Sequence, residues 1–236
     1  MQETDGTFVA SLTAGNPTLQ PYESLNFDLS VEYYLPSGLI SVAPFYKRID
    51  NPIYDRSTVE QNVLRNERTF SRLSVERPEN AENGRIAGVE FNVQNSFSRL
   101  PSPFDGLGAN VNYTWTDSSV TVFGRSDDLP FFQQSDHVGN IAALYTKFGV
   151  EAQVSLSFQS ASLGTVGGSA ASDNYSDRYT PLDAKVSFPL QRRLRGFLEF
   201  RNLNDEPRRR FAGISDRRVQ HELYARDVFF GVDWRY

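Results

Sequence analysis

The sequence predicts an all-β protein, an antiparallel up-and-down transmembrane β-barrel. Long segments alternate apolar and polar residues with a period of two, which is the pattern of a strand with two different faces. Short turns alternate along the chain with long polar connections, as they do in outer-membrane barrels. No apolar run approaches the roughly 20 residues that a membrane helix needs. We expect about nine strands in this chain of 236 residues.

Three segments give the clearest strand patterns. In residues 24–35, Leu25, Phe27, Leu29 and the apolar residues that follow them fall on one face, with polar residues on the other. Residues 107–116 and 150–158 repeat this pattern. Less regular alternation predicts six further strands, at 39–49, 85–98, 137–147, 179–188, 194–203 and 223–236.

Two of these weaker strands carry a specific problem. Pro44 lies inside the segment 39–49, and proline removes a hydrogen-bond donor from a ladder. In 137–147 the facing is ambiguous, because the alternation beginning at Ile141 competes with the alternation beginning at Val138 for the apolar face.

The connections between the strands are of two kinds. Turns at 36–38, 147–149 and 189–193 are short, and the one at 100–106 is slightly longer. They alternate with long polar stretches, expected to be loops, at 50–84, 117–136, 161–178 and 204–222. This order predicts tight periplasmic turns, extracellular loops and a periplasmic C-terminus.

Composition narrows the class of protein. The net charge of -5 argues against a nucleic-acid partner, and the absence of cysteine excludes disulfides and thiolate metal sites. A mean hydropathy of -0.46 is compatible with a barrel, because only one face of each strand meets lipid. A soluble β-sandwich also alternates. Small neutral residues on the polar faces, with aromatic residues near strand ends, favour the membrane barrel.

Both ends of the chain resemble a known family. The segment Gly15-Asn16-Pro17-Thr18-Leu19-Gln20-Pro21-Tyr22-Glu23 is similar to the G-N-P-x-L-x-P-E entry into a barrel strand of TonB-dependent receptors, with Tyr22 intervening before the glutamate. Phe200-Arg201-Asn202-Leu203-Asn204-Asp205-Glu206-Pro207 resembles their penultimate strand and N-L-x-D loop. Residues 224–236, ending at Tyr236, resemble their closing strand, and residues 45–53 and 88–91 resemble internal strands.

The resemblance implies a 22-stranded barrel filled by an N-terminal plug, with a TonB box before the plug. Residues 1–236 would be the C-terminal part of the barrel domain, with plug and box lying outside the chain. Met1–Asp5 also lacks the apolar core of a secretory signal, so we expect the true N-terminus upstream. The implied function is active uptake of a siderophore or a similar scarce nutrient across the outer membrane of a Gram-negative bacterium.

The resemblance also implies partners. These are TonB, reached through the missing plug, a small-molecule ligand, outer-membrane lipid and lipopolysaccharide, and the barrel assembly machinery, which would recognise the strand ending at Tyr236.

Candidate ligand contacts lie in the long polar stretches. Arginine forks suit carboxylates, phosphates and ferric-siderophore anions, and equally the phosphates of lipopolysaccharide. Aromatic side chains could stack on a flat ligand or pack one loop against another. The candidates are Arg208, Arg209, Arg210, Arg217, Arg218, Phe131, Phe132 and Tyr175. The simpler interpretation of the arginines is a solvated loop partly neutralised by neighbouring carboxylates.

Catalytic and metal sites are not expected. His137 and His221 lack a compelling third ligand, so a surface role is the better interpretation of both. No G-x-S-x-G motif occurs, and the glycine-rich segment 164–168 lacks the lysine of a phosphate-binding loop. We therefore expect no enzyme activity and no cofactor. Two alternatives stay open: a small outer-membrane barrel that is an enzyme or adhesin, and a soluble carbohydrate-binding sandwich.

Overall fold

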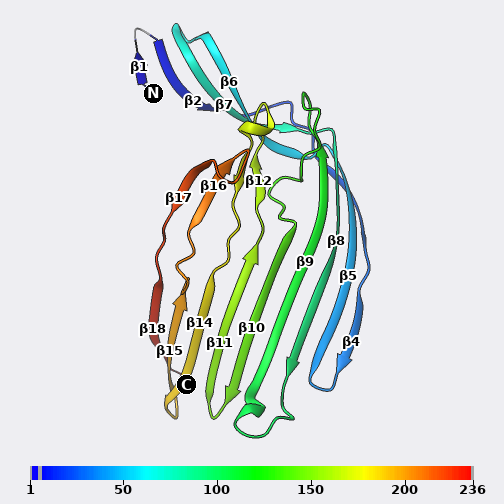
Figure 1. The fold of residues 1–236 in the computed structure, drawn as a ribbon, viewed down its shortest axis with the longest axis vertical. Coiled ribbons are helices and arrows are strands. Elements are labelled where there is room, and N and C mark those ends of the chain that lie inside the picture. The colour runs from blue at the N-terminus through cyan, green and yellow to red at the C-terminus, as the bar shows by residue number, and fades with distance from the viewer. Residues whose placement is uncertain (1, 5–6, 235–236) are drawn as a thin grey trace.

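The computed structural model describes residues 2–4 and 7–234, and Figure 1 shows a curved sheet of long strands with a smaller β-structure at one end. The large sheet is antiparallel, with the order β18-β15-β14-β11-β10-β9-β8-β5-β3, and β4 pairs beside β3 on β5. Because β3 and β4 share one edge position, its ten strands fill the nine positions expected from the sequence. The strands are β3 (Glu23–Asp28), β4 (Val31–Leu35), β5 (Gly38–Asp50), β8 (Asn83–Ser96), β9 (Leu107–Thr121), β10 (His137–Lys147), β11 (Val150–Gln159), β14 (Leu182–Gln191), β15 (Leu194–Arg201) and β18 (Asp227–Trp234).

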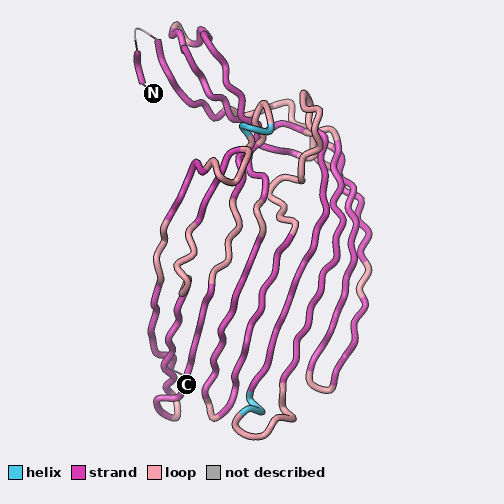
Figure 2. Tube along the Cα trace, viewed as in Figure 1, coloured by secondary structure: helices cyan, strands magenta, loops and turns pink. Residues whose placement is uncertain are grey.

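The sheet is open in this chain, with β3 and β4 at one edge and β18 at the other. It is one continuous curved sheet and not the pair of packed sheets of a sandwich (Figure 2). The only helices among the described residues are two single 3₁₀ turns, η1 (Phe104–Gly106) and η2 (Ala170–Ser172), and neither could cross a membrane. The expected all-β barrel architecture is confirmed.

The register settles the facing of β10. Residues directly opposite one another in a sheet point to the same face, and Ile141 lies opposite both Val111 and Leu156. Ile141 therefore shares their apolar face, and it is 54% exposed there. The same row continues across the sheet through Tyr33, Ile40, Val93, Val111, Ile141, Leu156 and Leu182.

The opposite face is polar at the same height. A second cross-strand row consists of Glu32, Ser41, Asn92, Asn112, Asn140 and Ser157. The side-chain amide of Asn140 donates a hydrogen bond of 2.8 Å to the Ser157 hydroxyl. The large sheet, which we call the wall, thus has one apolar and one polar surface. A membrane β-barrel with a water-filled interior requires such a wall.

Pro44 breaks the neighbouring edge strand, whereas its own strand, β5, is continuous. β5 continues through Pro44, whose carbonyl accepts a 3.1 Å hydrogen bond from the Leu29 amide. The nitrogen of Pro44 faces the same side and has no proton to donate. The edge strand breaks at this height, between Asp28 and Val31, which divides the expected strand 24–35 into β3 and β4.

Turns at one end of the sheet are tight. Phe148 and Gly149 join β10 to β11 with φ values of 54° and 77°. Two successive positive φ values define a type I′ hairpin turn, whose second position glycine occupies without steric cost. The C-terminal part of β18 lies at this same end (Figure 1). Tyr236, on which the expected assembly signal depends, lies outside the described residues.

Most of the long polar stretches, which we expected to be loops, contain strands of their own. Residues 50–84 contain a hairpin of β6 (Ile53–Arg65) and β7 (Arg68–Asn80), and β2 (Thr7–Thr13) adds parallel to β7, followed by β1 (Gln2–Thr4). The alternation is hidden because charged residues occur on both faces of this arm. Its core is small, with Phe70, Leu73 and Val75 packed against a few partly buried neighbours.

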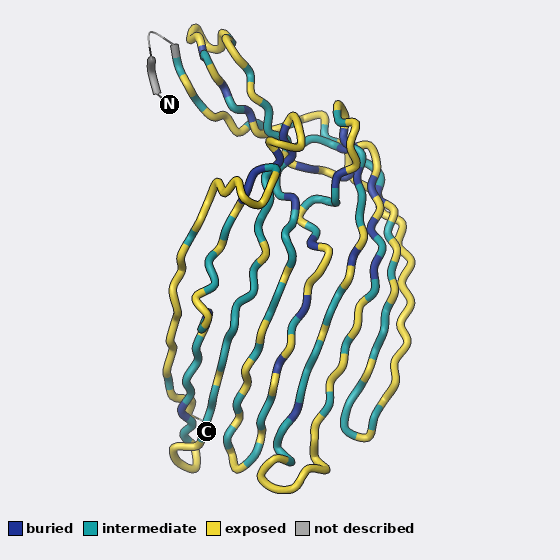
Figure 3. The backbone as a smooth tube through the Cα atoms, viewed as in Figure 1, coloured by how far each residue is buried: buried dark blue, intermediate teal, exposed yellow. Residues whose placement is uncertain are grey.

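Burial is concentrated where the long connections meet (Figure 3). A cluster of buried residues joins β6, the end of β9, the segment after β9 and β12. Its members are Tyr54, Ala81, Val120, Val122, Leu129, Leu163 and Val166, with Phe131, Phe132 and Tyr175 packed against it. This loop core holds the connections in one fixed arrangement, whereas most of the wall is exposed on its apolar face.

A candidate ligand-binding site on the loop-end sheet

A second four-stranded sheet is built from two connections that we expected to be loops. Its order is β12-β13-β16-β17, with β12 (Ser162–Thr165) and β13 (Asn174–Ser176) from one connection and β16 (Arg208–Ala212) and β17 (Arg218–Glu222) from the other. The sheet extends the line of β11, β14 and β15 beyond the wall (Figure 1). We call it the loop-end sheet.

One face of the loop-end sheet is buried. Leu163, Tyr175 and Phe211 lie opposite one another across three strands. Leu163 is fully buried, and the rings of Tyr175 and Phe211 stack at 5.0 Å with an interplanar angle of 6°. Leu163 and Tyr175 belong to the loop core or pack against it. Burial of this face fixes the orientation of the other.

The other face of the loop-end sheet is polar. One residue from each strand forms a continuous row, which consists of Ser162, Ser176, Arg210 and Gln220. A second row places Arg208 opposite Glu222. We call these six residues the polar platform.

Two hollows meet on the polar platform. The first, of about 140 Å³, is lined by Gln159, Ser176, Asp177, Tyr179, Arg208, Arg209, Arg210, Gln220 and Glu222. The second, of about 390 Å³, is lined by Asp55, Gln133, Gln159, Ser162, Gly164, Thr165, Asn174, Tyr175, Ser176 and Arg210. Gln159, Ser176 and Arg210 line both, so Arg210 stands at the boundary.

The three arginines of β16 have different surroundings. Arg209 is neutralised by Asp177 and Glu206, each at 3.6 Å. The Arg208 guanidinium lies over the Tyr179 ring, 4.4 Å from its centroid. Arg210 has no carboxylate within ion-pair distance among the described residues and is exposed. It is therefore the arginine best placed to receive an anionic group.

Glu222 is held as an anion beside these cations. Hydrogen bonds from Tyr224 and Gln220, more than the charges of Arg210 and Arg208, hold the pKa of the Glu222 carboxyl below its ordinary value. The same hydrogen bond raises the pKa of the Tyr224 hydroxyl. At neutral pH the polar platform therefore carries both signs of charge.

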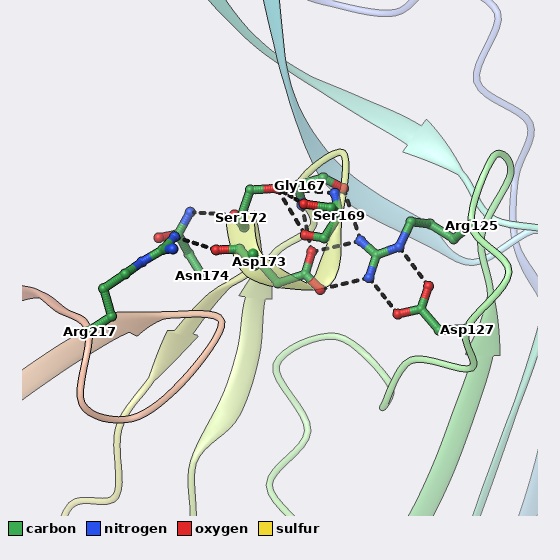
Figure 4. Close-up of polar contacts among 9 residues, drawn as sticks. Arg125, Asp127, Gly167, Ser169, Ser172, Asp173, Asn174 and Arg217 are labelled. Carbon is green, nitrogen blue, oxygen red and sulfur yellow. Dashed lines mark hydrogen bonds and ion pairs between the residues drawn. The ribbon is translucent and has the colours of Figure 1, made fainter.

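A buried ion pair fixes the loop beside the second hollow. The guanidinium of Arg125 donates two hydrogen bonds of 2.9 Å to Asp173 and two, of 2.8 and 2.6 Å, to Asp127 (Figure 4). The side chains of Arg125 and Asp173 are only 6% and 1% exposed. The Asp173 carboxylate also accepts a hydrogen bond of 2.8 Å from the Gly167 amide. The hydrogen bonds that Arg125 donates to Asp127 and Asp173 raise the pKa of its guanidinium above its ordinary value.

We call Arg125, Asp127 and Asp173 the clasp. Arg125 follows β9, whereas Asp173 directly precedes β13. The clasp thus joins two connections that are 48 residues apart at the ion pair. Its position sets where β13, and with it Ser176 of the polar platform, comes to lie.

The predicted contact residues divide into two groups. Arg208, Arg209, Arg210 and Tyr175 line the hollows. The others do not: Arg217 hydrogen-bonds to the Ala171 carbonyl, Arg218 is an exposed residue at the start of β17, and Phe131 and Phe132 pack against the loop core. The rings of Phe132 and Tyr54 stack at 4.9 Å. These aromatic residues therefore pack one loop against another, which was the alternative to ligand contact.

The two histidines lie on strands of different sheets and have different neighbours. His137 is at the start of β10, where its Nδ1 is 2.8 Å from the Tyr113 hydroxyl, and His221 is in β17 opposite Arg209. The part of the chain that the structure describes contains no group of three or more side chains placed to hold a metal ion.

Several residues of the site were not anticipated from the sequence. Ser162, Ser176, Gln159 and Gln220 of the hollows, and the Arg125–Asp173 pair, gave no signal strong enough to select them. The only local sign was the alternation of Ser162 with Leu163 and of Tyr175 with Ser176, in strands of four and three residues. Strands this short do not separate from loop sequence by period alone.

Comparison with known proteins agrees with this architecture. A family model described as "TonB dependent receptor-like, beta-barrel" matches residues 2–203. No curated protein matches. Among solved structures, a mutant of the ferric enterobactin receptor PfeA from Pseudomonas aeruginosa is 16% identical with a TM-score of 0.56, covering 93% of this chain and 32% of that one.

Two further structures are similar to the chain. The copper transporter OprC is 12% identical with a TM-score of 0.64, covering 92% of this chain and 32% of its own. The ferric citrate transporter FecA is 15% identical with a TM-score of 0.61, covering 89% and 30%. The chain therefore spans about a third of the length of these structures.

These structures share the fold, and they are receptors and transporters by name. The family model covers well over half of the chain, and the open antiparallel sheet with its apolar and polar faces is what a section of such a barrel requires. The chain belongs to the β-barrel domain of the TonB-dependent receptors, which are outer-membrane transport receptors of Gram-negative bacteria.

Proposed function

We propose that this chain forms the C-terminal part of the barrel wall of an active importer, whose loop-end sheet contacts a scarce nutrient such as a siderophore. The observation that carries the proposal is the polar platform, in which Arg208 and Arg210 line hollows fixed from behind by the loop core. A rigid scaffold under exposed polar groups is the usual construction of a binding site on loops.

The two faces of the wall support its place in the membrane. The row through Val93, Val111 and Ile141 would face lipid, and the row through Asn92, Asn112 and Asn140 would face the barrel interior. The tight turn at Phe148 and Gly149, and the C-terminus with it, would be periplasmic, with the loop-end sheet outside the cell.

Closure of the wall needs strands beyond this chain. The edges at β18 and at β3 and β4 expose unpaired backbone groups, and each such group in lipid costs several kcal/mol. We propose that strands from elsewhere in a 22-stranded barrel pair with both edges. A plug inside the barrel would connect the receptor to TonB, the strand ending at Tyr236 would address the assembly machinery, and lipid and lipopolysaccharide would surround the wall.

Uptake by whole cells tests the transport proposal. Cells lacking related receptors would express the complete receptor that contains this chain and be offered radiolabelled ferric enterobactin, ferric citrate and a uronate-bearing oligosaccharide. We expect accumulation of at least one probe that stops when tonB is deleted or a protonophore is added. Accumulation that persists without TonB would indicate a passive pore, and accumulation of none would contradict an importer for these classes.

A substitution tests the site itself. Arg210→Gln should lower accumulation of the transported probe, because it removes a platform charge that no described carboxylate pairs with. Arg218→Gln is the matched control, since Arg218 is an exposed arginine of the same sheet that lines neither hollow. If the two substitutions have equal effects on accumulation, the polar platform is not the ligand-binding site.

A further inference from the structure

The charges around the two hollows balance. Three arginines line them, and so do three carboxylates, Asp55, Asp177 and Glu222. Arg209 already pairs with Asp177, and Glu222 is held as an anion beside Arg208 and Arg210. The sequence indicated an arginine cluster partly neutralised by neighbouring carboxylates, and the folded site has no net positive charge with which to attract a multiply charged anionic chelate.

Uncharged hydrogen-bonding groups make up most of the remaining surface. Four hydroxyl or amide side chains, Gln133, Ser162, Thr165 and Asn174, line the larger hollow together with Gln159 and Ser176, which it shares with the smaller one. Each can both donate and accept hydrogen bonds. Many such groups around a shallow surface match a ligand that presents many hydroxyls.

One ring lies at the side of this surface. Tyr179 lines the smaller hollow under the Arg208 guanidinium, whereas the Tyr175 ring stacks on Phe211 on the buried face of the loop-end sheet. A tyrosine offers a flat apolar ring with one polar end, which suits a ligand that has both carbon–hydrogen and hydroxyl surfaces. The backbone of Tyr179 is held in place, because it exchanges two hydrogen bonds with the backbone of Gln159, of 3.0 and 3.1 Å.

Among the described residues, Arg210 supplies one unpaired cation where the two hollows meet. It lines both hollows and has no ion-pair partner among the described residues. A guanidinium binds a carboxylate through two parallel hydrogen bonds, which adds direction to charge. One fork of this kind accommodates one acid group.

We propose that the polar platform binds a hydroxyl-rich ligand that carries a single acid group, the chemistry of an acidic oligosaccharide, and discriminates against polyanionic chelates. Arg210 holds the acid group, and the hydroxyl and amide side chains of both hollows hold the rest. The inference rests on the proposed transport function and selects among the nutrients that such a receptor could import.

Binding to the purified complete receptor in detergent tests the ligand class. The probes are xylotriose carrying one glucuronic acid, xylotriose alone, and ferric enterobactin, each titrated by calorimetry. We expect the acidic sugar to bind, and the neutral sugar to bind about 10- to 100-fold more weakly, the usual range for loss of one charge-assisted pair. Ferric enterobactin should bind least.

Variants locate the acid group. Arg210→Gln should weaken binding of the acidic sugar to the level of xylotriose and leave xylotriose itself unchanged, whereas Arg218→Gln should change neither. Retention of the wild-type melting temperature by Arg210→Gln would show that the fold is intact. Ser176→Ala should weaken both sugars alike, because it removes a hydrogen-bonding group and no charge.

Three outcomes would overturn the inference. These are failure of the acidic sugar to bind, equal affinity for the two sugars, and Arg210-dependent binding of ferric enterobactin that is tighter than that of the acidic sugar. The last outcome, together with TonB-dependent uptake, would leave the transport function standing and remove only the ligand class. Uptake that is independent of TonB, with the expected sugar affinities, would leave the ligand class standing and remove the proposed transport function.

Discussion

The clasp should decide whether the loop beside the larger hollow is ordered, and Asp173→Ala is the sharpest way to break it. The substitution removes a carboxylate that is 1% exposed and that accepts two hydrogen bonds from Arg125 and one from the Gly167 amide. It leaves a buried guanidinium half paired and a buried amide without its acceptor.

The expected cost follows from the burial. Removing one partner of a buried ion pair costs about 3 to 5 kcal/mol, because the remaining charge stays desolvated. Asp127→Ala is the matched control, since it removes a carboxylate from the same guanidinium at a side chain that is 45% exposed. Exposed pairs contribute about 0 to 1 kcal/mol, so the control should have a small effect.

Hydrogen exchange of the complete receptor measures both variants. A local loss of 3 to 5 kcal/mol corresponds to exchange that is faster by about two to nearly four orders of magnitude in residues 163–176, with exchange in the wall strands unchanged. Exchange in Asp127→Ala should rise by less than about tenfold. The reasoning is refuted if the two variants exchange alike, or if Asp173→Ala stays within a few-fold of the unmodified receptor.

Three other predictions concern the wall and the clasp. Val111→Arg, on the apolar face, should hinder folding of the complete receptor into lipid vesicles by about 2 to 4 kcal/mol if the position lies near the midplane, whereas Asn112→Arg on the polar face should be tolerated; equal damage would contradict the facing. Gly88→Ala should destabilise the wall by about 1 to 3 kcal/mol in a denaturant titration, because its new methyl would lie 2.4 Å from the Trp115 carbonyl oxygen, whereas Gly168→Ala, with open space around it, should be silent. The hydrogen bonds from Arg125 hold the pKa of Asp127 below its ordinary value of 3.8, so its contribution to the clasp is present above pH 3.8 and is lost as pH falls through the lower folded-state pKa. Pepsin cleavage between residues 122 and 129, measured from pH 5 to pH 2, should therefore accelerate toward acid in the unmodified receptor relative to Asp127→Asn, and parallel pH profiles would count against this linkage.

The wall was predictable from the sequence because its two environments, lipid and water, impose a strict period of two on long strands. Residues 107–116 and 150–158 show this directly, and they form the first two thirds of β9 and nearly all of β11. The facing of β10 was not predictable from its own residues. Ala142 and Ala143 are too similar in polarity to mark a face, and only the cross-strand position of Ile141 between Val111 and Leu156 resolves it.

The candidate site was predictable only in its residue types. Arg208 and Arg210 stood out as a charge cluster, but the sequence did not show that Asp177 and Glu206 neutralise Arg209, or that Ser162 and Ser176 lie beside Arg210. These neighbours come from connections far apart in the chain. They are brought together by strands of three to five residues that tertiary packing stabilises. A local sequence pattern does not predict strands of this kind.

The loop core has a consequence for how specificity changes between receptors. The loop-end sheet rests on its own buried cluster, with Leu163 and Val166 inside it, and the long ladder from β8 to β11 keeps its register through separate pairs. On the function proposed above, substitutions at Arg210, Gln220 or Ser176 would change which ligand binds without shifting any strand of the wall. Such a division would let a new ligand specificity arise on an unchanged wall.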